Sequence, residues 1–231
     1  GFNVGDRVVA HGHGSYAKYA YADASRTVKI PANVSFAEAA GIVTPGITAY
    51  KAVYYFGAVK SGQTVVVRGA SGGVGSLAAQ LAVNLGATVI GIGSSRNEAY
   101  VRSLGVSDYV SYNKQDPAMV LTNRADVVIN SALNGADIDA DAQIVKDNGI
   151  ITSVGGDKPL SNKPFEFKPI SPTKAVSDAE ALNTLLQLMA EKKLTIKIGY
   201  QLPFTIDGII EGHQLLGKQH DGRIVVTVDP S

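Results

Sequence analysis

Hydrophobic and polar residues in the middle of the chain form blocks that predict a strand, a helix and a second strand. Thr64–Val67 is a continuous apolar and β-branched run, as expected for a parallel strand covered on both faces. Small and apolar residues then recur at helical spacing, at Leu77, Ala78, Leu81, Ala82 and Leu85. Gly86 suits the end of this helix, and Thr88–Ile92 is the second strand. The pattern predicts a βαβ unit.

The alternation of strands and helices continues after this unit. It predicts helices at Glu98–Leu104, Pro117–Thr122 and Ile138–Val145, and strands at Tyr109–Tyr112, Ala125–Asn130 and Gly149–Val154. Repeated β–α units at this spacing predict an α/β fold with a parallel, doubly wound sheet. Residues 157–172 contain four prolines and predict a loop or an edge segment.

The N-terminal part of the chain has a different pattern. Short strands are predicted at Arg7–Ala10, Ser15–Tyr21 and Thr27–Ile30. Ser35 and Glu38 form a capping box that opens a short helix. Thr44–Gly46 is expected to interrupt this helix because it contains a proline and a glycine, and helical spacing resumes over Ile47–Phe56.

The C-terminal part begins with a second capping box, formed by Ser177 and Glu180. The pattern after it predicts helix Ala179–Lys192, strand Ile196–Leu202, helix Ile206–Leu216 and strand Arg223–Val228.

The turn between the first strand and its helix has the spacing of a phosphate-binding loop. Ala70–Gly75 follows the pattern G/A-x-G-x-x-G, in which Gly72 lets the backbone approach a diphosphate and Gly75 lets the helix pack closely on the strand. The amide groups and the dipole at the start of the helix favour an anion there. The candidate binding residues of this turn are Ser71, Gly72, Gly73, Val74 and Gly75. A tight turn with no ligand is the alternative.

The turn after the second strand indicates which dinucleotide would bind. NAD-dependent enzymes place an acid about 20 residues after the glycine motif, where it holds the ribose 2′-hydroxyl. Here the turn reads Gly93, Ser94, Ser95, Arg96, and the first acid is Glu98, on the next predicted helix. Two hydroxyls and a guanidinium suit a 2′-phosphate, which a carboxylate at position 93 would repel. NADP(H) is therefore the expected cofactor; an ordinary polar loop with a solvated arginine is the alternative.

Composition narrows the class of protein. With 21 Lys and Arg against 20 Asp and Glu in 231 residues, the sequence does not suggest a nucleic-acid or membrane-surface partner. It has no cysteine, which excludes disulfides, thiolate nucleophiles and cysteine-ligated zinc within this chain. His11 and His13 form an H-x-H pair that we expect to be solvated. We expect a cytoplasmic protein.

Several segments together resemble a known family. Residues 14–53, 62–91, 103–112 and 222–228 are similar to the quinone oxidoreductase (ζ-crystallin-like) branch of the medium-chain dehydrogenase/reductase superfamily. The resemblance implies a Rossmann domain and a chaperonin-like β-barrel domain built from both chain ends. It implies a remnant of the substrate domain at residues 1–45, a dinucleotide-binding domain at 46–175 and a return to the substrate domain at 176–231. Because Gly1 stands just before a predicted strand, we expect earlier barrel strands upstream.

The resemblance also implies roles for individual residues. Three places match cofactor-binding positions of the family. Thr48 matches a threonine near the nicotinamide, and Asn130 and Ser131 match a strand end. Val154, Gly155 and Gly156 match the strand end that would receive the nicotinamide ring. Tyr112 matches a tyrosine near the 2′-phosphate, with a half-buried strand aromatic as the alternative. Arg223 matches a basic residue that reaches the diphosphate, with an exposed cation as the alternative. Thr44 stands where zinc-dependent relatives have a metal-ligating cysteine.

The expected function is a metal-free, NADPH-dependent oxidoreductase that transfers hydride to a quinone or an α,β-unsaturated carbonyl. The sequence identifies no catalytic residue. The alternative is an NADPH-binding protein with little or no turnover, because part of the substrate domain is missing. The resemblance further implies a homodimer formed through a sheet edge near Gly149–Val154 and the proline-rich segment after it.

Overall fold

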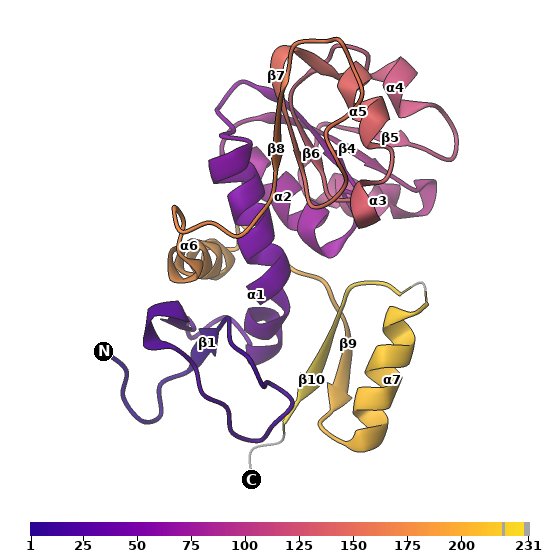
Figure 1. The fold of residues 1–231 in the computed structure, drawn as a ribbon. Helices are drawn as coiled ribbons and strands as arrows, with labels where there is room; N and C mark the ends of the chain where they lie inside the picture. Colours follow the sequence, from indigo (N-terminus) through magenta and orange to yellow (C-terminus); the bar gives the residue numbers. More distant parts are fainter. Residues whose placement is uncertain (219, 229–231) are drawn as a thin grey trace. The chain divides into compact units, whose positions relative to one another are not determined.

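Six parallel strands form one sheet, in the order β5-β4-β3-β6-β7-β8. The computed structural model describes residues 1–218 and 220–228, and the sheet belongs to Thr48–Val176, one of two compact units. The elements of this unit, seen in Figure 1, are the π-helical turn η2 (Lys51–Phe56), β3 (Thr64–Arg68), α2 (Gly73–Asn84), β4 (Thr88–Gly93), η3 (Ser95–Asn97), α3 (Glu98–Ser103), β5 (Asp108–Ser111), α4 (Pro117–Val120), β6 (Ala125–Asn130), η4 (Leu133–Gly135), α5 (Ile138–Ile144), β7 (Val145–Ser153) and β8 (Glu166–Pro169). The predicted Rossmann fold is confirmed.

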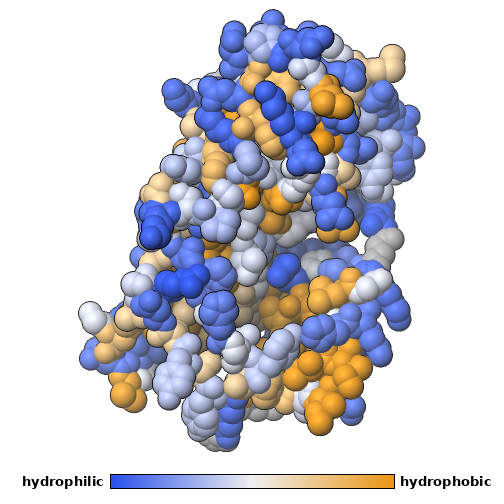
Figure 2. Space-filling view, in the orientation of Figure 1, coloured by the Kyte–Doolittle hydropathy of each residue, from blue (hydrophilic) through white to orange (hydrophobic). Residues whose placement is uncertain are grey.

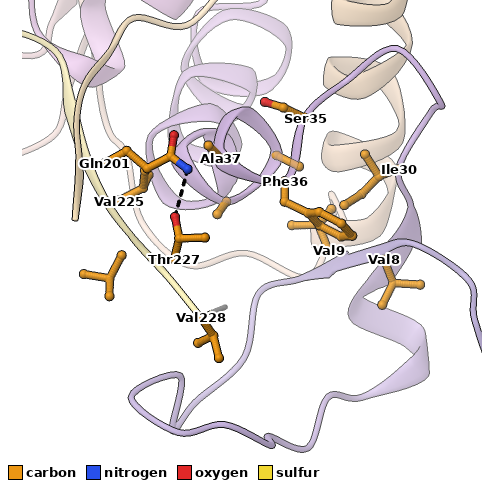
Figure 3. A pocket seen from close by; sticks show the side chains of 13 residues that line it. Val8, Val9, Ile30, Ser35, Phe36, Ala37, Gln201, Val225, Thr227 and Val228 are labelled. Atoms are coloured by element: carbon orange, nitrogen blue, oxygen red, sulfur yellow. Dashed lines mark hydrogen bonds between the residues drawn. The ribbon is translucent and has the colours of Figure 1, made fainter. Parts of the chain in front are cut away.

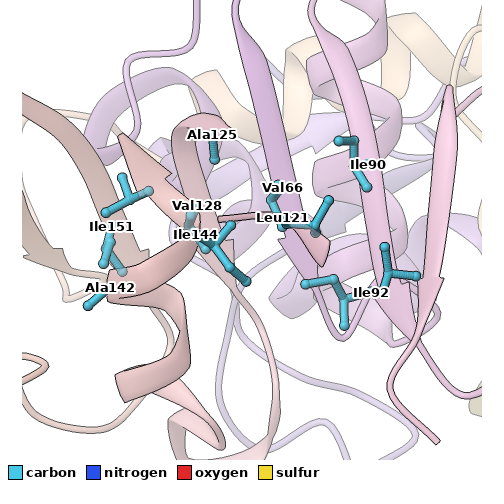
Figure 4. Close-up of a cluster of buried hydrophobic side chains, with 11 residues drawn as sticks. Val66, Ile90, Ile92, Leu121, Ala125, Val128, Ala142, Ile144 and Ile151 are labelled. Atoms are coloured by element: carbon cyan, nitrogen blue, oxygen red, sulfur yellow. The ribbon is translucent and has the colours of Figure 1, made fainter. Parts of the chain in front are cut away.

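Helical segments cover both faces of this sheet. Successive residues of a strand point to opposite faces of the sheet, so the neighbours of Val127 and Val128 show what covers each face. Val128 lies in a buried cluster with Ile144 of α5 and with Leu121, which directly follows α4 (Figure 4). Val127 faces the other way, where its Cγ1 lies 3.2 Å from the position that a Cβ on Gly57 would take. Burial on both faces explains why these strands are continuous apolar runs in the sequence.

The strand order reverses between β3 and β6, which are neighbours in the sheet although β4 and β5 separate them in sequence. In open parallel sheets, ligands bind outside the carboxyl ends of the strands at such a reversal. The carboxyl ends here are Arg68 of β3, Gly93 of β4 and Asn130 of β6.

Strand β8 lies at one edge of the sheet, and β7 pairs with β6 on one side and β8 on the other. The predicted edge or loop at 157–172 therefore contains a short strand. Gly149–Val154 was expected near an exposed edge, but most of it belongs to β7, an interior strand of the described sheet. The homodimer stays a prediction.

The second unit combines Gly1–Ile47 with the segment that begins at Ser177. Its elements are β1 (Val8–Ala10), η1 (Ala24–Arg26), β2 (Thr27–Lys29), most of α1 (Phe36–Tyr50), α6 (Asp178–Ala190), β9 (Ile198–Pro203), α7 (Ile206–Leu216) and β10 (Arg223–Thr227). Strands β1 and β2 form an antiparallel pair, and β9 and β10 form a parallel pair. The chaperonin-like barrel and the assignment of the chain's segments to two functional domains stay predictions.

The capping box of Ser35 and Glu38 is confirmed, and Ser177 is confirmed as the N-cap of α6. The Ser35 Oγ accepts a hydrogen bond of 3.2 Å from the Glu38 N–H, and the Glu38 carboxylate accepts one of 2.9 Å from the Ser35 N–H. At the start of α6, the Ser177 Oγ accepts a hydrogen bond of 3.0 Å from the Glu180 N–H. Both caps satisfy amide groups that the first helical turn leaves without an intrahelical partner.

Two predictions for the N-terminal part are wrong. Ser15–Tyr21 is irregular, because its alternating tyrosines face no partner strand and Tyr16, Tyr19 and Tyr21 are exposed. Helix α1 continues through Pro45 instead of breaking there. Tertiary packing overrides the local signal: a Cβ on Gly46 would lie 2.8 Å from both Ile42 Cγ1 and Leu185 Cδ1, so α1 and α6 are in close contact at this position.

No helix in the described part of the chain is long and apolar enough to cross a membrane. Figure 2 shows apolar side chains gathered over α7, where Ile206, Ile210 and Leu216 are exposed.

Candidate functional site

The turn after β3 is built around a close contact between backbone groups. Gly69 has a positive φ of 72°, and its carbonyl accepts a hydrogen bond of 2.9 Å from the Gly72 N–H. A Cβ on Gly75 would lie 2.2 Å from that carbonyl oxygen and 2.6 Å from the Ser131 Oγ. Only glycine fits at position 75, because α2 begins directly against the turn.

The start of α2 can receive an anion. The residue before the helix is Gly72, which provides no side-chain cap, so the amide groups of Gly73, Val74 and Gly75 are not capped by it. A Cβ on Gly72 would have one neighbour within 4 Å, the Gly69 carbonyl oxygen at 3.3 Å. Unpaired amides and the positive end of the helix dipole favour a phosphate group at this position.

A cavity of about 400 Å³ opens at the carboxyl ends of β3, β4 and β6. Its lining combines the glycine turn, the turn after β4 and the loop after β6, and consists of Arg68, Gly69, Ser71, Gly72, Gly93, Ser94, Arg96, Asn97, Tyr112, Ser131, Ala132, Leu133, Ala136 and Asp137. The predicted site residues Ser71, Gly72, Ser94, Arg96, Tyr112 and Ser131 are therefore brought together. The cavity lies at the position where a sheet of this order binds ligands.

The turn after β4 presents a cation and hydroxyl groups to the cavity. Arg96 is exposed, and its guanidinium makes no hydrogen bond or ion pair with any residue that the structure describes. Tyr112 follows β5, and its side chain is exposed rather than half-buried. The acidic Glu98 begins α3, as predicted, and pairs with Arg102 at 2.9 Å.

Ser95 is directed to a different partner. Its N–H donates a hydrogen bond of 2.8 Å to the Asn113 Oδ1, and its hydroxyl accepts one of 2.9 Å from the Asn113 side-chain amide. Ser95 is absent from the lining of the cavity. These two bonds hold the turn in shape, and a binding role for Ser95 stays a prediction, while Ser94 and Arg96 line the cavity.

A buried polar network supports the end of β3. Arg68 and Asp141 are buried, and the Arg68 Nε donates a hydrogen bond of 2.8 Å to the Asp141 Oδ1. The Arg68 Nη2 lies 2.8 Å from the same oxygen but is not aligned for a hydrogen bond. Asn130 donates a hydrogen bond of 2.7 Å to the other carboxylate oxygen. Burial raises the pKa of Asp141 to about 6, whereas Arg68 and Asn130 act in the opposite direction.

Two predicted site residues, Asn130 and Ser131, make hydrogen bonds that support this end of the sheet. Asn130 is fully buried, and its side-chain amide also donates a hydrogen bond of 3.0 Å to the Ala136 carbonyl. It therefore holds the loop after β6 in position. Ser131 lines the cavity, and its hydroxyl donates a hydrogen bond of 2.6 Å to the Arg68 carbonyl.

The other predicted site residues lie outside the lining. Val154, Gly155 and Gly156 follow β7, and a Cβ on Gly135 would lie 2.3 Å from the Gly155 carbonyl oxygen. Thr48 lies in α1 and Arg223 begins β10 in the other unit. Arg223 is not an exposed cation: burial lowers its pKa, and its Nε is buried without a hydrogen-bond partner among the described residues. A binding role for these residues stays a prediction.

Sequence reasoning missed part of the lining. Arg68, Asn97 and Asp137 were not expected to line the cavity, whereas Gly69 and Gly93 adjoin predicted residues. The signal for Arg68 was its place at the end of an otherwise apolar strand, because a charge on a buried strand needs a partner. That partner, Asp141, lies on α5 and could not be identified from local spacing.

A second cavity, of about 620 Å³, lies in the other unit between β1, α1 and β10. Figure 3 shows the apolar side chains of Val9, Ile30, Phe36 and Val225 around it. Two of its lining residues are joined by a hydrogen bond of 3.0 Å from the Gln201 side-chain amide to the Thr227 hydroxyl.

Comparison with known proteins relates the chain to a family. The sequence profile of the zinc-binding dehydrogenases matches residues 73–192, which include α2 and most of the sheet. The chain belongs to this family. A similar solved structure is an alcohol dehydrogenase superfamily protein from Novosphingobium aromaticivorans (26% identity, TM-score 0.88, 99% of this chain and 76% of that chain). Another is the quinone oxidoreductase from Coxiella burnetii (28% identity, TM-score 0.79, 99% of this chain and 74% of that chain). The resemblance seen in the sequence is confirmed.

Two further proteins are similar to this chain. Highly reducing polyketide synthase 40 from Fusarium pseudograminearum (strain CS3096) is 26% identical over 99% of this chain, which covers 10% of the length of that protein. A mycobacterial protein solved in complex with NADPH has the same fold (23% identity, TM-score 0.78, 97% of this chain and 75% of that chain). The cofactor predicted from the sequence is therefore present in a structural neighbour.

The residues of this chain do not fit a catalytic zinc ion. The sequence has no cysteine, and Thr44, the position that matches the zinc-ligating cysteine, lies in α1. No group of three or more His, Cys, Asp or Glu comes together within residues 1–218 and 220–228. His11 was expected to be solvated, but its Nδ1 lies 2.8 Å from the Asp178 carboxylate and 3.0 Å from Arg26; His13 is exposed.

Proposed function

We propose that this chain binds NADP(H) and belongs to a metal-free oxidoreductase that reduces a quinone or an α,β-unsaturated carbonyl compound. The observation that carries the proposal is the cavity at the carboxyl ends of β3, β4 and β6. It combines Gly72, the residue directly before α2, with a turn that offers Arg96 and Ser94 and no carboxylate. The lining contains one acidic residue, Asp137, in the loop after β6. Its carboxylate lies 3.5 Å from the Arg68 Nη1, with which it forms an ion pair.

The residues present fit a phosphorylated dinucleotide. The amide groups of Gly73, Val74 and Gly75 would bind the diphosphate, because a helix start favours negative charge. Arg96 would pair with the 2′-phosphate, since a guanidinium presents several donors to phosphate oxygens. Bound NADPH would supply the hydride. The structural neighbour with NADPH supports this choice of cofactor.

The substrate class follows from the chemistry that the chain can provide. The described residues contain no group of three or more metal-binding side chains. Reduction of a conjugated system is therefore favoured over reduction of a simple carbonyl, because conjugation spreads the charge that hydride addition creates. The similarity to the Coxiella quinone oxidoreductase supports a quinone as the hydride acceptor, and an α,β-unsaturated carbonyl is a conjugated acceptor of the same kind.

The test is a binding measurement followed by an activity screen. Titration with NADPH and NADH should show tighter binding of NADPH. The protein with NADPH should then oxidise the cofactor in the presence of 1,4-benzoquinone, 9,10-phenanthrenequinone or a crotonyl thioester, followed by the absorbance of reduced nicotinamide. Binding without oxidation by any acceptor would support the alternative, an NADPH-binding protein with little turnover. Absence of binding to either dinucleotide would refute both.

A further inference from the structure

A buried tyrosine lies directly beneath the turn that would bind the 2′-phosphate. Tyr109 belongs to β5 and pairs with Gly91 of β4. Its hydroxyl donates a hydrogen bond of 2.7 Å to the carbonyl oxygen of Ser94, the first residue of the turn. The side chain therefore reaches along β4 from Gly91 to the carboxyl end of that strand.

Two glycines of β4 make room for this ring. A Cβ on Gly91 would lie 3.1 Å from the Tyr109 Cδ2, and a Cβ on Gly93 would lie 2.3 Å from the Tyr109 Oη. The next atom near position 93 is the Tyr109 Cζ, at 3.3 Å. The hydroxyl oxygen is therefore the main obstacle to any side chain at the end of β4.

The hydroxyl remains a hydrogen-bond donor under ordinary conditions. Tyr109 is buried, with 5% of its surface exposed, and burial raises its pKa to about 12. The protonated phenol can then donate to the Ser94 carbonyl throughout the neutral pH range.

We infer that Tyr109 is a positioning residue for cofactor choice, which favours NADP(H) over NAD(H) by holding Ser94 and by occupying the space of an acidic side chain at position 93. The inference rests on the proposed function. NAD-dependent enzymes use an acid at the end of this strand to hold the ribose 2′-hydroxyl. Here the Tyr109 hydroxyl occupies that space, and the turn that it fixes presents Ser94 and Arg96 to the cavity.

The first experiment compares Tyr109→Phe with the wild type in titrations with NADPH and NADH. Loss of one hydrogen bond to the turn should raise the Kd for NADPH about threefold to tenfold. The Kd for NADH should change much less, because NADH has no 2′-phosphate for the turn to hold. Tyr54→Phe is the matched control: it removes a tyrosine hydroxyl in the same unit but outside the lining of the cavity, and should leave the ratio of the two Kd values unchanged.

The second experiment tests the steric part with a double-variant cycle. Gly93→Asp alone should lower the melting temperature and weaken binding of both dinucleotides, because its Cβ collides with the Tyr109 Oη. In the Tyr109→Phe background that oxygen is gone. Gly93→Asp should therefore lower the melting temperature less than it does in the wild-type background, and the double variant should bind NADH more tightly than NADPH. This result does not depend on Tyr109→Phe alone having a measurable effect on binding.

The outcomes separate the inference from the proposed function. If the wild type binds neither dinucleotide, the proposed function fails and the inference fails with it. If the wild type prefers NADPH but Tyr109→Phe keeps the same ratio of Kd values, only the inference is overturned. It is also overturned if Gly93→Asp has equal effects on melting temperature with and without the Tyr109 hydroxyl.

Discussion

The Asn97 side-chain amide donates a hydrogen bond of 2.9 Å to the Ser71 hydroxyl. Ser71 lies in the glycine turn after β3, and Asn97 ends η3 after β4, so this bond joins two turns that line the same cavity. The glycine turn would bind the diphosphate and the other turn the 2′-phosphate. Their relative position therefore decides whether one dinucleotide can contact both.

Asn97→Ala should weaken NADPH binding more than it destabilises the fold. Loss of one neutral hydrogen bond costs about 0.5–1.5 kcal/mol in stability, which is a few degrees of melting temperature for a chain of this size. The Kd for NADPH, measured by fluorescence titration, should rise because the two turns are no longer joined. Asn33→Ala is the control: it removes a hydrogen bond of 2.8 Å to the Ala190 carbonyl in the other unit, and should lower stability without changing the Kd.

Gly75→Ala and Gly72→Ala should separate folding from binding. At position 75 the new Cβ would lie 2.2 Å from the Gly69 carbonyl oxygen, and overpacking of this kind costs about 1–3 kcal/mol or more. At position 72 the corresponding distance is 3.3 Å, so this variant should keep a melting temperature close to that of the wild type. Its added methyl group stands where the backbone would approach the diphosphate, so NADPH and NADH should both bind more weakly. Equal melting temperatures for the two variants would contradict the packing argument.

Arg96→Ala should weaken NADPH selectively. One charge-assisted contact to phosphate is worth roughly 1.5–3 kcal/mol, or on the order of tenfold to a hundredfold in Kd. The Kd for NADH should be nearly unchanged. Arg102→Ala serves as the control, because Arg102 lies on α3, pairs with Glu98 and is absent from the lining. A wild type that binds NADH as tightly as NADPH would show that Ser94 and Arg96 do not recognise the 2′-phosphate.

Asp126 should contribute a pH-dependent part of the stability. Burial alone would raise its pKa, but hydrogen bonds of 2.7 Å from the Lys146 Nζ and from the Thr64 N–H outweigh burial, and the pKa is lowered from 3.8. A folded-state pKa below the unfolded value stabilises the protein above the unfolded pKa, and this stability is lost as the pH falls through the folded pKa. When the pH is lowered from about 5 to about 3, the melting temperature of Asp126→Asn should therefore fall less than that of the wild type.

Asp147→Asn is the matched control for this pH prediction. Asp147 is an exposed aspartate of β7 in the same sheet. Its replacement should leave the acid-side loss of melting temperature as in the wild type. Parallel pH profiles for Asp126→Asn and the wild type would show that the contacts of Asp126 do not stabilise its ionised form.

The succession of strands and helices along residues 64–154 could be predicted from sequence alone. Strand β6, at Ala125–Asn130, has the predicted bounds, and the glycine turn precedes α2 as its spacing indicates. These features depend on periodicity and on turn residues, which act between neighbours in the chain. The absence of an acid in the turn after β4 is likewise visible in the sequence.

The tertiary structure decided what the sequence pattern could not. Pro45 is expected to end a helix, yet α1 continues through it and packs closely on α6 at Gly46. Ser15–Tyr21 alternates like a strand but has no partner strand. The contact between Tyr109 and Gly93, and the pairing of Arg68 with Asp141, join elements that are separated in sequence. Local spacing determines which elements form, because it depends on adjacent residues. Register and packing between distant segments determine which side chains meet, and no local pattern encodes them.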